Sequence, residues 1–340
     1  MMKSFVFKMF YEVVRKTPLL NHLAHKIMQS EWVHHFPLYR WLYWKLIKNK
    51  AERIKKAPSF LEITLTDKCN ARCIMCPPEV HTGNTFMDNE LYERIIKEAY
   101  DVGIRKLIIT GGEALLDREI HRKISYAKDL GYEHIHMFTN GSLMNETRSE
   151  EIISSGLDSL TWSIDSSLKE EYEKIRVGLK FDKVISNMKG FSVLRNQMNS
   201  KKPLTRINMV ALEENKLHRK NFREFFSNFV DIVEIIDSHN FAGSQSGLST
   251  DSGKEYSQLT RYPCHLLFIK LVVWPNGIVR KCSIDYAEHA NMGDLKSSSV
   301  NEVLNSTRLI DLKNRHLKCD FNEPGCDVCT FKESWWVKPV

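Results

Sequence analysis

Three cysteines are the residues in this 340-residue sequence whose spacing most directly suggests chemistry. Cys69, Cys73 and Cys76 follow an apolar segment that is predicted to be a strand, and two prolines directly after Cys76 prevent the loop from continuing as regular structure. Thiolates hold iron-sulfur clusters, and because a 4Fe-4S cube has four irons, three cysteines leave one iron open to a substrate or cofactor. The alternatives are buried structural thiols or a zinc site, for which His81 is the nearby fourth ligand.

Glycines and polar residues follow the next predicted strands. Gly111-Gly112-Glu113 comes after the second strand, where two glycines allow close approach of the backbone and the carboxylate can accept hydrogen bonds from an ammonium group. Thr139-Asn140-Gly141 follows the third strand, and Ser163-Ile164-Asp165 ends the fourth. In TIM-like barrels the catalytic groups lie at the C-terminal ends of the strands, so these residues are candidates for binding a ligand.

The CxxxCxxC loop, the Gly-Gly-Glu sequence and the turn at Asn140 together resemble the radical S-adenosylmethionine (radical SAM) superfamily. The resemblance implies a 4Fe-4S cluster whose open iron binds the amino and carboxylate groups of SAM. It also implies that an electron from the cluster cleaves SAM to methionine and a 5'-deoxyadenosyl radical, which abstracts a hydrogen atom from the substrate. For Asp165, a hydrogen bond within the strand-end turn is an alternative. The resemblance assigns Cys69, Cys73 and Cys76 to the cluster and Gly111, Gly112, Glu113, Asn140, Ser163, Asp165 and Arg176 to SAM, with adenine contacts at 210–215.

The C-terminal region has cysteines of its own. Cys264 precedes a predicted hairpin, in which the Pro275-Asn276-Gly277 turn joins strands at 269–274 and 278–281, and Cys282 follows it. A hairpin with a cysteine at each outer end brings the two thiolates near one another. This pattern, with a C-terminal CxxC, resembles the SPASM/twitch extension of radical SAM enzymes. The resemblance implies a second, auxiliary 4Fe-4S cluster, for which a structural zinc is the alternative, held by Cys264, Cys282, Cys326 and Cys329.

Cys319 remains outside this assignment. It is an incidental or buried thiol, a cluster ligand in place of one of the four, or the hydrogen-atom donor that a radical epimerase needs to quench the substrate radical. A thiol has a weak S–H bond, so the catalytic role is chemically reasonable.

Composition places the chain among soluble globular proteins, with 42% hydrophobic and 27% charged residues. No apolar run approaches the roughly 20 residues that a membrane span requires. Eight cysteines in a chain of this size are typical of metal ligands in a reducing compartment, so we expect a cytoplasmic location.

Residues 1–57 are basic and aromatic. Twelve Lys and Arg against three Glu give +9, which leaves about −2 for the rest of a chain with net charge +7. We expect helices here, divided by Pro18 and Pro37. The segment is an interfacial helix at the membrane surface, an arm for an acidic or lipid-linked substrate or a partner protein, or an extension packed on the barrel. Nucleic acid is not expected, because no recognition motif accompanies the charge.

The fold class predicted is α/β. Strands expected at 61–65, 106–110, 134–139, 159–164, 206–210 and 232–236 alternate with helices such as 89–101 and 117–130, which gives a parallel sheet with helices outside. The resemblance implies a partial TIM-type (β/α)6 barrel at 58–240, after the helical extension at 1–57 and before a small Cys-rich α+β SPASM/twitch-like domain at 241–340.

By analogy with the family, the expected activity is oxidation or epimerisation of a carbinol in a sugar- or aminocyclitol-type small molecule, either free or lipid-linked. A reducing protein such as flavodoxin or ferredoxin would supply the electron. Peptide modification is the second hypothesis, although residues 1–57 are too short and too helical for the winged-helix domain that such enzymes often carry. The hypothesis from another class is a non-catalytic metal-binding or membrane-associated interaction protein.

Overall fold

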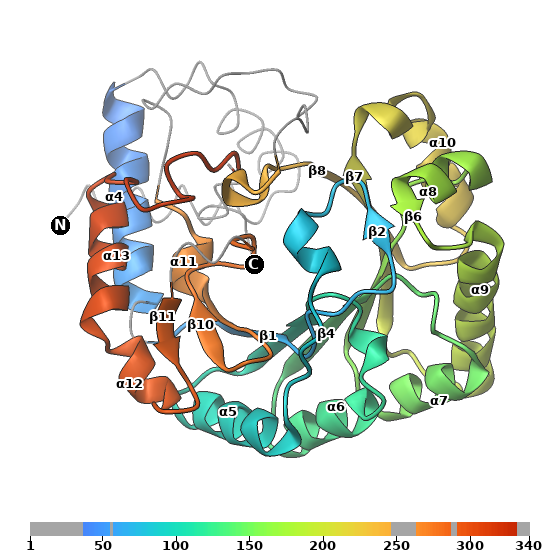
Figure 1. The fold of residues 1–340 in the computed structure, drawn as a ribbon, viewed down its shortest axis with the longest axis horizontal. Coiled ribbons are helices and arrows are strands. Elements are labelled where there is room, and N and C mark those ends of the chain that lie inside the picture. Colours follow the sequence, from blue (N-terminus) through green and yellow to red (C-terminus); the bar gives the residue numbers. More distant parts are fainter. Residues whose placement is uncertain (1–36, 55–56, 246–262, 287–290, 332–340) are drawn as a thin grey trace, which may run out of the picture.

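A computed structural model describes residues 37–54, 57–245, 263–286 and 291–331 of the chain. Its core is a nine-stranded sheet in the order β11-β10-β9-β1-β3-β4-β5-β7-β8, which curves into a partial barrel (Figure 1). The six strands from β1 to β8 in this order are parallel neighbours. They are β1 (Phe60–Thr64), β3 (Lys106–Thr110), β4 (His134–Thr139), β5 (Ser159–Ser163), β7 (Leu204–Ala211) and β8 (Ile232–Asp237).

These six strands confirm the predicted barrel, with differences of one or two residues at the ends. Their side chains alternate between two faces, as a strand requires. Leu107 and Ile109 of β3 and Ile135 and Met137 of β4 are fully buried on the outer face, while polar residues such as His136 point to the inner face.

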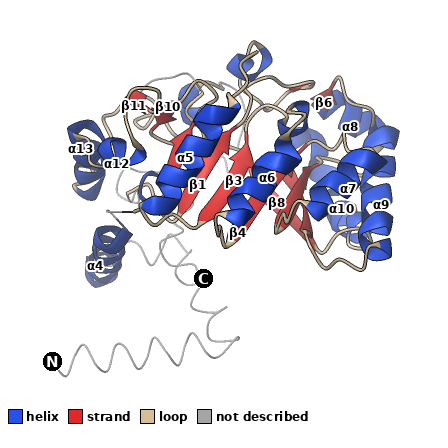
Figure 2. Ribbon diagram, turned by 90° about the horizontal axis from the view of Figure 1, so that it is seen from below, coloured by secondary structure: helices blue, strands red, loops and turns tan. Residues whose placement is uncertain are grey.

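Helices cover the outer face of the sheet, and Figure 2 shows α5 (Asn89–Asp101) and α6 (Ile120–Asp129) lying across β1, β3 and β4. The predicted helix at 89–101 is confirmed, and the Asp88 carboxylate caps it by accepting from the backbone N–H groups of Glu90 and Leu91. The helix predicted at 117–130 begins at Ile120. The remaining outer helices are α7 (Glu146–Ser154), α8 (Lys169–Ile175), α9 (Phe181–Gln197) and α10 (Arg219–Phe226).

The C-terminal hairpin extends the barrel sheet. Strand β9 (Lys270–Val273) pairs in parallel with β1, and β10 (Ile278–Arg280) returns antiparallel to it before β11 (Asn291–Asp294). The predicted hairpin is therefore present, but it continues the same sheet as the barrel strands. The division at residue 240 stays a prediction. Short helices complete this region: α11 (Leu266–Ile269), α12 (Val300–Leu304) and α13 (Thr307–Leu317).

Helix α4 (Pro37–Ile54) is the described part of the basic N-terminal segment. Its Ile47 and Ala51 are fully buried in the core, while Trp41 is 56% exposed with the Lys45 ammonium 5.0 Å from its ring centre. The helix therefore packs on the barrel through one side, as the third hypothesis for residues 1–57 expected. Residues 1–36, on which the other two also depend, lie outside the described residues.

Candidate functional site

The cysteine loop lies just beyond β1, at the C-terminal end of the strand. Its central residues form the short strand β2 (Arg72–Cys73), which pairs with β6 (Arg176–Val177). Cys73 and Cys76 share a hydrogen bond that lowers the pKa of Cys73 to about 7 and raises that of Cys76, while burial raises the pKa of Cys69 to about 11. The charge of Cys73 also raises the pKa values of Cys69 and Cys76. The three thiols therefore lie close together, as the ligands of one cluster would.

The Arg176 guanidinium lies against this loop. Its Nε donates to Asp165 Oδ2 at 2.5 Å, and its Nη1 lies 3.7 Å from Cys73 Sγ. Asp165 is fully buried, and its other oxygen accepts from the Val210 N–H at 2.7 Å. Both groups were predicted to contact SAM. The geometry gives Asp165 partners within the strand-end region, as its alternative expected, and places a positive charge next to Cys73. The contacts of both residues with SAM stay predictions.

The Gly-Gly-Glu sequence is held against the segment that leads into the cysteine loop. The Gly112 N–H donates to Thr66 O and the Glu113 N–H to Lys68 O, each at 2.9 Å. A Cβ atom on Gly112 would lie 2.0 Å from Lys68 O, so this close approach requires glycine. Gly111 has a φ of 129°, which L side chains rarely adopt.

The Glu113 carboxylate is buried and already bonded within the protein. It accepts from Thr139 Oγ1 at 2.6 Å, the Asn140 N–H at 2.7 Å and the Leu115 N–H at 3.1 Å. Burial raises its pKa, and these hydrogen bonds oppose that shift. With three of about four acceptor positions occupied, Glu113 anchors the turn at 139–140 and has little capacity left for an ammonium group.

Hydrogen bonds between side chains link that turn to the cysteine loop. Asn140 Nδ2 donates to Asn70 Oδ1, and Asn70 Nδ2 donates to Ser142 Oγ, both at 2.8 Å. The roles of Asn70 and Ser142 were not predicted, and the position of Asn70 inside the CxxxCxxC loop was the available signal. Ser163, also a predicted SAM contact, ends β5 opposite Asn208 and is half-buried.

The four cysteines predicted to hold the auxiliary cluster also come together. The pKa of Cys282 is raised by burial and by the negative charges of Cys264, Cys326 and Cys329. Lys281 holds the hairpin to the loop before the CxxC, since its Nζ donates to Pro324 O at 2.6 Å. This donor set suits an iron-sulfur cluster.

Cys319 lies just after α13, between Cys282 and Cys326 in the sequence. Its thiol is exposed and its φ is 58°. The thiolate charges that act on Cys282 are those of the other three predicted ligands. An exposed thiol does not favour the hydrogen-donor hypothesis, because a radical must be quenched inside a site that excludes water.

Tyr286 lies near the cysteine loop, and its position was not predicted from the sequence. Burial raises its pKa, with contributions from the negative charges of Cys76, Glu62 and Cys69. Its ring packs edge-on against Trp274 and Phe241, at centroid distances of 5.2 and 5.7 Å. The side chain therefore connects the C-terminal hairpin region to the cysteine loop.

The inner face of the sheet carries paired polar groups. Lys270 of β9 donates to Glu62 of β1 at 2.5 Å, and Arg206 of β7 donates to Glu234 of β8 at 2.9 Å. Between them, His136 Nε2 lies 3.0 Å from Thr161 Oγ1. Burial lowers the pKa of His136 to about 3, and the positive charges of Arg206 and Lys270 contribute, so this imidazole is neutral near pH 7.

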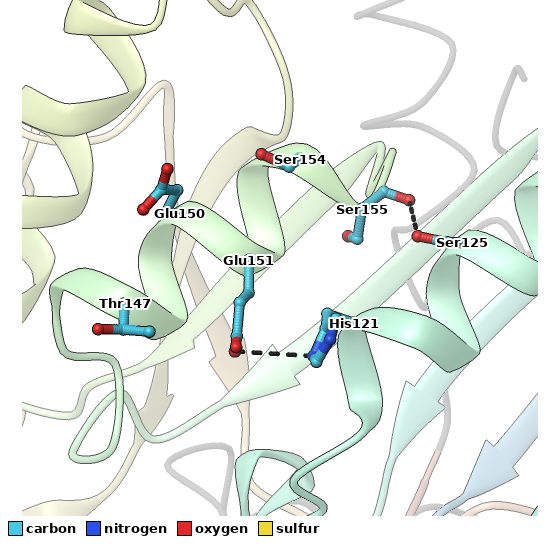
Figure 3. A pocket seen from close by; sticks show the side chains of 7 residues that line it. All are labelled: His121, Ser125, Thr147, Glu150, Glu151, Ser154 and Ser155. Carbon is cyan, nitrogen blue, oxygen red and sulfur yellow. Dashed lines mark hydrogen bonds and ion pairs between the residues drawn. The ribbon is translucent and has the colours of Figure 1, made fainter.

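A groove of about 330 Å³ lies elsewhere, on the outer surface between α6 and α7. Figure 3 shows the His121 ring pointing to Glu151, with 3.6 Å between the nearest nitrogen and oxygen. The groove is on the helical side of the sheet and does not include the predicted site residues.

The described residues contain neither a site for a single metal ion nor a membrane-spanning helix. In ranges 37–54, 57–245, 263–286 and 291–331, no group of three or more His, Cys, Asp or Glu side chains is arranged to hold a single metal ion. No helix in the same part of the chain is long and apolar enough to span a membrane.

Comparison with known families agrees with the arrangement of the two cysteine sites. Residues 63–226 match the radical SAM superfamily, and residues 264–330 match SPASM, an iron-sulfur cluster-binding domain. The chain therefore contains a radical SAM domain and a SPASM domain. A radical SAM domain binds a 4Fe-4S cluster and SAM, and a SPASM domain binds auxiliary iron-sulfur clusters, so these predicted cofactors are confirmed at the level of the domains.

Curated relatives match part of the chain. A GTP 3',8-cyclase of Syntrophomonas wolfei is 34% identical over 122 residues, which are 34% of this chain and 37% of the relative. A probable GTP 3',8-cyclase of Methanocaldococcus jannaschii is 31% identical over 179 residues, 52% of this chain and 58% of the relative. The chain thus spans less than two thirds of the length of these relatives.

Solved structures share the fold. Streptococcus suis SuiB bound to its precursor peptide SuiA has a TM-score of 0.63 at 15% identity, covering 78% of this chain and 69% of that one. BtrN in complex with AdoMet and 2-DOIA has a TM-score of 0.54 at 14% identity, covering 81% and 94%. At these identities the likeness concerns the fold alone.

Proposed function

We propose that this enzyme cleaves SAM reductively and oxidises or epimerises a carbinol of a sugar- or aminocyclitol-type small molecule, free or lipid-linked. The observation that carries the substrate class is the inner face of the sheet, where the Lys270–Glu62 and Arg206–Glu234 pairs flank His136. Such paired donors and acceptors suit a hydroxylated substrate, which can exchange hydrogen bonds with them.

The roles proposed for the chain's residues follow from their positions. Cys69, Cys73 and Cys76 hold the first cluster, which when reduced supplies the electron that cleaves SAM. Gly112 lets the segment after β3 approach the cysteine loop closely. The backbone of this segment can then reach a ligand bound at the loop. The cysteines around Cys282 hold an auxiliary cluster with all four ligands from the protein, which suits electron transfer better than substrate binding.

The partners and location are proposals as well. A flavodoxin or ferredoxin would reduce the first cluster, and the protein would work in the cytoplasm. Peripheral membrane contact through residues 1–57 is retained as a proposal for the segment that precedes the barrel.

A second candidate is a nucleotide substrate, which the relatives named GTP 3',8-cyclase favour. Arg206 and Lys270 add to this, because guanidinium and ammonium groups bind phosphate. Peptide modification is the remaining candidate and is favoured by the fold shared with SuiB.

The test is anaerobic turnover of the reconstituted enzyme with dithionite and SAM, followed by mass spectrometry of 5'-deoxyadenosine. An aminocyclitol deuterated at its carbinol carbons should transfer deuterium into that product. Deuterium transfer from labelled GTP instead would replace the first candidate by the second. No SAM cleavage by protein with both clusters intact would favour the non-catalytic hypothesis.

A further inference from the structure

The β2–β6 pair is a two-stranded ribbon whose two faces differ. Arg72 lies opposite Val177, and Cys73 lies opposite Arg176. Side chains alternate along strands, so each opposed pair shares a face. The inner face carries Cys73 and Arg176, both buried and 3.7 Å apart at Sγ and Nη1. The outer face carries Arg72 and Val177, which are exposed. One thickness of backbone therefore separates a cluster cysteine from the surface.

The outer side combines apolar and positively charged groups. Ile74 and Val177 are 37% and 43% exposed, and Arg72 and Lys174 are exposed beside them in the sequence. The Ile74 N–H donates to Ile175 O at 3.0 Å, which fixes the loop to the end of α8 next to Lys174. We call Arg72, Ile74, Lys174 and Val177 the ribbon surface.

The two cations of the ribbon surface are not neutralised by direct ion pairs, although Glu170, one helical turn before Lys174, is also exposed. In the part of the chain that the structure describes, neither Arg72 nor Lys174 forms an ion pair. By contrast, two neighbouring lysines are neutralised, because Lys169 pairs with Asp182 and Lys180 with Glu173. An apolar centre with unpaired cations is suited to a transient contact with an acidic protein, since complementary charge speeds the encounter of the two surfaces.

We propose that the ribbon surface is the docking site for a small acidic one-electron carrier protein. The carrier is oxidised by one electron and the cluster held by Cys69, Cys73 and Cys76 is reduced by one, with no bond made or broken. This inference rests on the proposed function, because it assumes that the cysteine loop holds a redox-active cluster. Redox contacts of this kind are small, and a patch of four residues can form the centre of one.

The test compares two reductants on the same protein. Full-length enzyme with both clusters is mixed anaerobically with reduced flavodoxin or with dithionite, and cluster reduction is followed by stopped-flow absorbance. In R72E/K174E the second-order rate constant with flavodoxin should fall at least about 10-fold at low ionic strength, while the rate with dithionite changes less than about 2-fold. Added salt should slow the wild type, whereas it should speed R72E/K174E, in which it screens a repulsion between the variant and the acidic carrier.

Two further variants control for charge and folding. K201E/K220E changes two other exposed lysines by the same total charge and should keep the wild-type rate with flavodoxin. R72Q/K174Q removes charge without reversing it and should give an intermediate rate. If R72E/K174E loses iron, the rate of R72Q/K174Q with flavodoxin becomes the test of the docking site.

The outcomes are distinct. Wild-type rates with flavodoxin in R72E/K174E and R72Q/K174Q, or an equal loss in K201E/K220E, would overturn the docking site. A wild-type cluster that dithionite cannot reduce would instead overturn the proposed function.

Discussion

The two cysteine sites of this protein are built differently. Cys69, Cys73 and Cys76 come from one short loop after a buried strand, and a guanidinium lies 3.7 Å from one of the sulfurs. The site around Cys282 instead collects thiols from before the hairpin, after it and from the CxxC loop, and the charges of the other three thiols act on Cys282.

This difference separates two kinds of chemistry. A loop with three thiols and an adjacent positive charge can hold a cluster with an open iron and favour its reduced, more negative state. Four thiols with a buried member can enclose a cluster completely. Net charge and hydrogen bonds to sulfur tune the potential of such clusters, so the two sites should differ in potential as well as in ligand count.

The largest effect should come from removing the loop thiols. Replacing Cys69, Cys73 and Cys76 together by alanine should abolish SAM cleavage and lower the iron content from about eight to about four per chain, because the auxiliary site keeps its own ligands. Iron analysis and electron paramagnetic resonance measure both. The matched variant C282A should lose iron from the other site and keep a signal that SAM perturbs. Loss of all iron in the triple variant would show that the two sites do not assemble independently.

A smaller effect is expected from Arg176. R176Q removes the positive charge beside Cys73, so the potential of the first cluster should fall by tens of millivolts while that of the auxiliary cluster stays constant. The variant also leaves Asp165 buried without its ion pair, at a cost on the order of 3 kcal/mol in the free energy of unfolding. A redox titration followed by paramagnetic resonance measures the potentials.

The double variant D165N/R176Q separates the two consequences. It removes both charges and should recover part of the lost stability. Its potential should lie between those of R176Q and the wild type, because the negative charge of Asp165 also acts on Cys73. An unchanged potential in both variants would mean that the guanidinium only braces the loop.

The sequence predicted the six barrel strands and both groups of cysteines, because these depend on local periodicity and spacing. It did not predict that β9 pairs with β1, since strands some 200 residues apart in the chain carry no local signal of their pairing. It also did not predict the three donors that the fold supplies to the Glu113 carboxylate from the 115 and 139–140 segments. The contact of Glu113 with SAM stays a prediction. The position of Tyr286 near the cysteine loop likewise depends on tertiary structure alone.

The inner face of the sheet should give the protein a pH-dependent stability. The pKa of His136 is about 3 in the folded protein and about 6.5 when unfolded, so the unfolded state takes up a proton first as the pH falls. This group's stabilisation is therefore complete above about pH 6.5 and is lost as the pH decreases toward 3. Between pH 7.5 and 5.5 the loss should be about 1.4 kcal/mol.

Urea unfolding of wild type and H136Q at these two pH values measures the effect. The other histidines contribute equally to both proteins, so H136Q should lose about 1.4 kcal/mol less than wild type over this interval. Equal losses of stability in the two proteins would indicate that the pKa of His136 is not lowered in the folded state. Burial and the positive charges of Arg206 and Lys270 would then not act on this imidazole.

The smallest effect should come from Cys319, and it sharpens the division between the two sites. C319A changes an exposed side chain, so its free energy of unfolding should stay within about 0.5 kcal/mol of the wild type and its iron content should not change. If the enzyme is a dehydrogenase, C319A should form the same product as the wild type. A loss of about four irons would instead make Cys319 a ligand of the auxiliary cluster. Unquenched or oxidised product from an epimerase would make it the hydrogen donor, which requires that this surface segment close over the substrate.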